Sequence, residues 1–106
     1  MVDVNVRSHR AGRRGFDSGF IDVPTTEGDL VDGDVYVSSI FISNTSSSSV
    51  TVTLRVKTNP AKTFYIKSLA ARNVDVLFFP EPVRFEGGIR GAASALGVVI
   101  NIAGYK

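Results

Sequence analysis

The side chains of this sequence that could do chemistry gather in two short blocks. Residues 7–14 hold four arginines and the only histidine of the chain, with no acid. Residues 17–34 hold six carboxylates and no lysine or arginine. Arginines can bind phosphates or carboxylates, and carboxylates can bind cations or arginines. This separation of charge indicates binding, and it is more informative than the net charge of +2.

The arginine cluster consists of Arg7, Arg10, Arg13 and Arg14. Three interpretations stay open: contact with nucleic acid phosphates, docking into an acidic groove of a protein partner, or a solvated tail. Nucleic acid is the weakest of the three, because the cluster is short and has no interleaved aromatic residues on which bases could stack. We therefore expect a protein partner rather than nucleic acid.

The acidic cluster consists of Glu27, Asp29, Asp32 and Asp34. Its spacing does not match an EF-hand calcium loop, and Asp32-Gly33 is an ordinary turn pair. We interpret it as a solvated acidic turn; a cation site and a receptor for the arginine arm of an adjacent subunit stay open. No metal site and no cofactor are predicted.

No constellation of catalytic residues is recognisable. His9 lies in a glycine-containing segment, which offers neither an orienting partner nor a shielded pocket. An enzyme would need paired carboxylates in a pocket, such as Asp75 with Glu81 or Glu86. We therefore expect a protein that is not an enzyme.

The length of 106 residues predicts one domain, which can bury a real core. The chain has no cysteine, so a disulfide framework and a thiolate metal site are excluded. No window approaches the roughly 20 apolar residues of a membrane helix. The first residues also lack the long apolar stretch of a secretory signal.

Alternating apolar and polar residues predict short strands, because successive side chains of a strand point to opposite faces. The clearest case is 50–57, where Val50, Val52, Leu54 and Val56 alternate with polar residues. The predicted strands are 20–23, 35–43, 50–57, 62–67, 73–79, 83–85, a short strand at Ile89, and 98–102. The segment 24–34 reads as a turn-rich connection, 44–49 as a hairpin loop, and only 68–72 and 90–95 could hold a helical turn.

The strand 35–43 and the proline pair need separate comment. Alternation breaks at Ser38-Ser39, which predicts a bulge or a change of sheet. We place Val35, Val37 and Phe41 on one side of this strand, and Tyr36, Ile40 and Ile42 on the other. Pro80 and Pro82 should break the strand that precedes them.

Together these signals predict an all-β protein, an antiparallel β-sandwich that is jelly-roll-like. Residues 1–19 form an extended basic N-terminal arm, and residues 20–106 form the sandwich domain. The arm has a single large apolar residue, Phe16, between residues 7 and 19. It therefore cannot bury much surface by itself.

The run Leu77-Phe78-Phe79 is apolar on both faces of its strand. Such a strand should be covered on one side by its own domain and on the other by another subunit, so we expect a homo-oligomer, as a closed ring of three copies. The residues predicted to bind partners are Arg7, Arg10, Arg13, Arg14, Phe16, Leu77 and Phe79. Asn44-Thr45-Ser46 fits the glycosylation pattern, although we treat it as loop. Tyr36, Tyr65 and Tyr105 could form a sugar-binding platform if they lie close together.

The segment from Ile21 to Tyr105 resembles small β-sandwich structural proteins of tailed bacteriophages. The resemblance rests on Ile21-Asp22-Val23-Pro24, on Val37 to Ser46 with Val50 to Leu54, on Phe85 to Ile89, and on Gly97 to Tyr105. The segment 24–34 is longer than the short turn typical of such proteins, and the arm is particular to this chain.

This resemblance implies a non-enzymatic protein of the virion. We expect a capsid decoration or cement protein that attaches through its arm and its sheet edges to capsid or tail proteins. A tail or neck adaptor, or a fibre-associated protein, is the nearest alternative. A carbohydrate- or receptor-binding module is an alternative of a different class.

Overall fold

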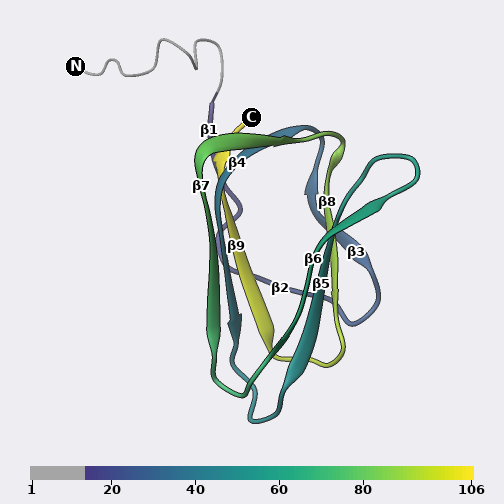
Figure 1. Ribbon diagram of the computed structural model, residues 1–106, viewed down its shortest axis with the longest axis vertical. Helices are drawn as coiled ribbons and strands as arrows, with labels where there is room; N and C mark the ends of the chain where they lie inside the picture. Colours follow the sequence, from purple (N-terminus) through teal and green to yellow (C-terminus); the bar gives the residue numbers. More distant parts are fainter. Residues whose placement is uncertain (1–13) are drawn as a thin grey trace, which may run out of the picture.

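A computed structural model of the protein describes residues 14–106, which fold into two antiparallel sheets packed as two layers (Figure 1). The strands of this part of the chain are β1 (Gly15–Asp17), β2 (Ile21–Asp22), β3 (Gly28–Asp32), β4 (Val35–Asn44), β5 (Val50–Val56), β6 (Lys62–Leu69), β7 (Val74–Phe85), β8 (Gly88–Ala93) and β9 (Val98–Tyr105).

The first sheet has the order β1-β9-β4-β7, with β2 also paired to β9, and the second has the order β3-β8-β5-β6. Successive strands alternate between the layers except within the pairs β1–β2 and β5–β6, which is the order of a jelly roll whose first strand is split into β1 and β2. The prediction of an all-β, jelly-roll-like sandwich is confirmed. Of the predicted arm, residues 1–13 lie outside the described part of the chain. The rest of the arm, residues 14–19, contains β1, which pairs with β9.

The core lies between the two layers and consists of aliphatic side chains from one face of each sheet. The apolar side chains with no exposed surface are Val35, Val37, Ile40, Ile42, Val52, Leu54, Ile89, Ile100 and Ile102. Burying each such side chain contributes about 1.5–3 kcal/mol against the unfolded chain. The apolar/polar alternation that produces this core was the strongest signal of the sequence. It also decides which side chains lie on the outer faces of the two sheets.

The predicted irregularity in β4 is present as a register shift between Val37 and Ser39, in the ladders with both β7 and β9. A bulge adds one residue, so the side-chain alternation reverses beyond it. Ile40 and Ile42 therefore join Val37 in the core, whereas Phe41 lies on the outer face. Our placement of Phe41 with Val37, and of the two isoleucines on the opposite side, was wrong.

Two segments predicted as connection or helical turn are strands. Residues 28–32 form β3, an edge strand that tolerates turn-forming residues and a bulge and buries Val31. Residues 90–93 belong to β8, where Gly91 faces the interior. A Cβ there would come within 2.7 Å of Leu30 Cδ1 and 3.0 Å of Leu54 Cδ2, so the residue is small because side chains of the two neighbouring strands, β3 and β5, fill the space over it. Helix propensity was the wrong explanation for this small-residue run.

Two further boundaries differ from the sequence analysis, the ends of β6 and β7. β6 runs to Leu69, and the chain then reverses through a turn at Arg72, whose φ is 63°, in place of a helical turn. β7 continues past both prolines to Phe85. Its pairing with β4 lapses between Phe78 and Val83, so neither proline needs to donate a ladder hydrogen bond.

The polar loop 44–49 joins β4 of the first sheet to β5 of the second, so it is a crossing between layers and not a hairpin. Asn44 is fully buried at its start. Its amide nitrogen donates to the carbonyl oxygens of Ser48, Leu69 and Ala70, at 2.8, 3.0 and 3.1 Å. Its side-chain oxygen accepts from the Ser46 amide and hydroxyl. The side-chain amide of this asparagine thus links the loop 44–49 to the end of β6 in the folded protein.

Substitution of Asn44 should destabilise the fold strongly. Asn44→Ala removes the hydrogen bonds of a fully buried side-chain amide, among them the buried bond to the Leu69 carbonyl and the two that it accepts from Ser46, so we expect a loss of about 2–4 kcal/mol in the free energy of unfolding. Urea denaturation followed by circular dichroism measures this loss. Asn101→Ala, in the half-buried outer face of β9, should cost less than about 1 kcal/mol. Equal costs for the two variants would refute the assigned role.

Candidate partner-binding surface

The outer faces of the two sheets differ in chemistry. On the second sheet, Arg55 and Arg90 are neighbours across β5 and β8, and Glu27 lies against both. Its carboxylate is 3.6 Å from Arg55 Nε and 3.4 Å from Arg90 Nη1. Asp29 on β3 continues the row, with Oδ1 3.4 Å from Arg90 Nε. We call this outer face the charged face.

Lys57 extends the row by donating to two carboxylates, Asp29 at 2.9 Å and Asp32 at 3.0 Å. The hydrogen bond from Lys57 lowers the pKa of Asp32 from its usual value, and the bonds to Asp29 and then Asp32 raise the pKa of Lys57. Asp34 accepts from Arg84 at 2.8 Å and from the Gly87 amide at 2.7 Å, which lowers its pKa.

Every carboxylate of the predicted acidic cluster therefore has a basic partner within the chain. Among residues 14–106, no group of three histidine, aspartate or glutamate side chains could hold a metal ion. Docking of an arginine arm from another subunit at this cluster stays a prediction, and it would have to compete with these internal ion pairs.

The outer face of the first sheet exposes large apolar side chains between smaller polar ones, and we call it the apolar face. On β7, Val74, Val76 and Phe78 are 50%, 52% and 72% exposed. They lie opposite Ser43, Phe41 and Ser39 of β4. The ring of Phe20 meets Phe41 edge-on, with centroids 5.6 Å apart, and is itself 64% exposed. Charged side chains at register positions of this face lie only at its rim: Asp17, Asp22 and Arg84.

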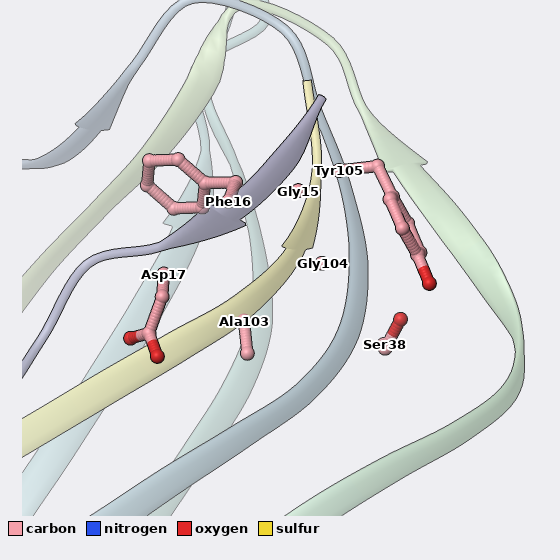
Figure 2. A pocket seen from close by; sticks show the side chains of 7 residues that line it. All are labelled: Gly15, Phe16, Asp17, Ser38, Ala103, Gly104 and Tyr105. Carbon is pink, nitrogen blue, oxygen red and sulfur yellow. The ribbon is translucent and has the colours of Figure 1, made fainter. Parts of the chain in front are cut away.

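A hollow of about 460 Å³ lies at the end of the first sheet where the β4 bulge falls. Figure 2 shows β1 and β9 beside it, with the side chains of Tyr105 and Ser38 close together. The hollow is lined by Gly15, Phe16, Asp17, Ser38, Ala103, Gly104 and Tyr105. Gly104 has no alternative there, because a Cβ would overlap the backbone carbonyl of Tyr36.

Four of the predicted partner-binding residues belong to the described part of the chain, whereas Arg7, Arg10 and Arg13 lie outside it. Arg14 is exposed, and its backbone exchanges two hydrogen bonds with Lys106, at 3.0 and 2.8 Å. Phe16 packs against the core, with Lys106 Nζ 5.4 Å from its ring centroid.

The other two predicted residues, Leu77 and Phe79, are half-buried on the inner face of β7. Phe79 packs against Phe85, with ring centroids 6.3 Å apart. The side chains of this strand that face solvent are instead Val76 and Phe78. Sequence reasoning could not choose between the two faces, because both are apolar. Asp75 is on the same face of the strand as Leu77 and Phe79, and its carboxylate suggests, wrongly, that this face is exposed to solvent.

Asp75 faces inward because Tyr65 meets it there. Tyr65 Oη, on β6 of the second sheet, donates to Asp75 Oδ2 at 2.7 Å, and Lys67 Nζ lies 3.4 Å from the same oxygen. The bond from Tyr65, followed by the charge of Lys67, lowers the pKa of Asp75. Burial, followed by this hydrogen bond, raises the pKa of Tyr65. The pair thus connects the edges of the two layers.

The three tyrosines do not form one platform. Tyr36 and Tyr105 are opposite each other in the first sheet, whereas Tyr65 belongs to the second sheet and is engaged with Asp75. The arrangement that a sugar-binding module would need is therefore not met by these three rings.

Comparison with known proteins adds no assignment. No protein-family model matches the chain. No curated protein sequence matches it either. No helix suited to crossing a membrane occurs within residues 14–106. Fold and surface define the protein as a jelly-roll β-sandwich with one charged and one apolar outer face.

The bond between Tyr65 and Asp75 should make stability depend on pH. The folded-state pKa of Asp75 is depressed, so its contribution is present above the unfolded value of about 3.9 and is lost as pH falls through the folded value. Tyr65→Phe should therefore lower the free energy of unfolding by on the order of 1 kcal/mol at pH 7. The difference should shrink as the pH falls below about 4. Urea titrations of both proteins at several pH values test this, and a difference independent of pH would contradict it.

Proposed function

We propose that the protein is a non-enzymatic structural protein of a tailed-bacteriophage virion, and that it decorates or cements the capsid. The observation that carries its binding role is the apolar face, on which large side chains stay exposed around Phe41. Exposed apolar patches of this kind mark interaction sites in soluble proteins. The jelly roll supports the assignment only by analogy, since one fold serves many functions. The virion location rests on the sequence resemblance.

The side chains available for chemistry support a binding role over catalysis. The carboxylates of the acidic cluster are held by Arg55, Lys57, Arg84 and Arg90, at exposed or half-buried positions outside the hollow. Asp75, which we considered as half of a catalytic carboxylate pair, is committed to Tyr65 and Lys67. Asp17, which lines the hollow, accepts a hydrogen bond from the Gly19 amide.

The arginines of residues 7–14 would supply the second contact with capsid or tail proteins. Arg14 is paired with Lys106, next to the end of β9, so a contact made by the preceding residues is transmitted directly to the first sheet. Two weak contacts on one small protein, repeated over many copies, bind much more strongly than either alone. A tail or neck adaptor would use the same two surfaces. The carbohydrate-binding alternative is not favoured by any observation.

This function predicts that the protein is a component of purified particles. Mass spectrometry of virions from the source lysate should detect it in many copies. Recombinant protein should rebind to particles stripped of it, and the double substitution Arg7→Gln with Arg10→Gln should weaken rebinding at least 10-fold, because each lost charge-assisted contact costs about 1 kcal/mol or more.

A matched control removes two positive charges from the sandwich instead. Lys62→Gln with Arg72→Gln changes two exposed residues, one at the start of β6 and one in the turn between β6 and β7, and should leave rebinding within about 2-fold. Absence of the protein from particles would refute the virion role. Equal weakening by both pairs would show that the arm has no special part in attachment.

A further inference from the structure

Three of the four sheet edges carry features that prevent pairing with another chain. β3 is bulged and carries Asp29 and Asp32. β6 carries Lys62 and Lys67. At the third protected edge, β1 and β2 are only 3 and 2 residues long and end in aspartates. Charges, bulges and very short strands are the usual means by which native proteins block edge-to-edge association.

The remaining edge, β7, has none of these features from Val74 to Phe79. Its outward side chains in this stretch are all apolar, and its only charged residue, Asp75, is turned inward to Tyr65. The first proline comes only at position 80. An edge strand of this kind is a template for a further strand.

We infer that β7 pairs with β7 of a second copy of this chain, antiparallel across a two-fold axis near Val76. Such a contact is self-complementary, because each strand offers the same residues to the other. With Val76 opposite its own copy, Val74 lies opposite Phe78. Six apolar side chains would then form one ladder, and the apolar faces of the two copies would join. This inference goes beyond the proposed function and does not depend on it.

The size of the contact determines its strength. Five residues at ~3.3 Å each give a paired length of roughly 17 Å, so the strand contact by itself covers much less than the ~800 Å² per partner of a standard interface. We therefore expect a dissociation constant on the order of 0.1 mM, which gives monomers in dilute solution and dimers at high concentration. The two-fold geometry also favours a dimer over the three-membered ring expected from the sequence.

Sedimentation equilibrium of the full chain, from about 10 µM to about 1 mM, tests the inference around the expected dissociation constant. Wild-type protein should pass from monomer to dimer. Val76→Lys should weaken dimerisation at least 10-fold, because two lysines would face each other near the axis. Circular dichroism and urea denaturation check that the variant is folded, as its 52% exposed position permits.

Two matched controls separate edge pairing from other contacts. Leu96→Lys changes an aliphatic residue that is 77% exposed outside β7, and Phe20→Lys changes the apolar face away from its β7 edge. Both should dimerise within 2-fold of wild type. Loss of dimer in Phe20→Lys would mean that the faces stack, and it would overturn edge pairing. A monomer throughout, a trimer, or an unaffected Val76→Lys variant would overturn it as well.

A covalent test is independent of affinity. The chain has no cysteine, so an introduced one is the only thiol. Opposite side chains of a strand pair are close enough for a disulfide, with Cβ atoms about 4.5–5.5 Å apart before adjustment. Val76→Cys should oxidise to a dimer at least 10-fold faster than Leu96→Cys. Equal rates would contradict the pairing.

Discussion

The bulge in β4 is the constraint on which the binding surface depends. This strand belongs to two ladders, and its register shifts between Val37 and Ser39 in both. One added residue lets Val37 and Ile40 both reach the core and turns Phe41 outward, where it supports Phe20. The same irregularity lies beside the hollow and explains the close approach of Gly104 to the Tyr36 carbonyl. Without the extra residue, two isoleucines would face solvent and Phe41 the core. The apolar face therefore follows from one local departure from regular alternation.

The two outer faces divide the polar and apolar roles of the surface. Exposed ion pairs such as those on the charged face contribute little to stability, because solvent screens them and ordering two long side chains costs entropy. These ion pairs matter instead for the kind of surface that the charged face presents to a partner. Carboxylates and basic groups are matched within the chain, so the charged face has little unmatched charge to offer a partner. The apolar face has the opposite character, since nothing within residues 14–106 covers Val76 or Phe78. Association through the apolar face removes apolar area from water without separating ion pairs.

The sequence predicts the layers of this protein better than its surface. Alternation predicted β5 and β9, the break at Ser38-Ser39 predicted a bulge or a change of sheet, and the fold class followed from the succession of short strands and turn signals. What failed depends on contacts that are distant in sequence. Residues 28–32 form a strand because they hydrogen-bond to the edge of β8. Gly91 of β8 is small because the side chains of Leu30 and Leu54 leave no room for a Cβ. The solvent-facing side of β7 was not predictable, because the hydrogen bond from Tyr65 that turns Asp75 inward joins two sheets. Asn44 has a role for the same reason, since its partners at Leu69 and Ala70 come from the end of another strand.

An unprotected edge is a hazard unless something limits how far association can proceed. A sheet that grows by adding copies needs two open edges, one to accept a strand and one to offer the next. In the first sheet the edge opposite β7 is formed by β1 and β2, which are short and carry Asp17 and Asp22. Pro80 and Pro82 also restrict regular pairing along β7 to the stretch before them. Two-fold pairing joins the open β7 edge of one copy to that of the other. The dimer then has only protected sheet edges. Association through β7 therefore closes at two copies, and a larger assembly must be built through the apolar face or the arm.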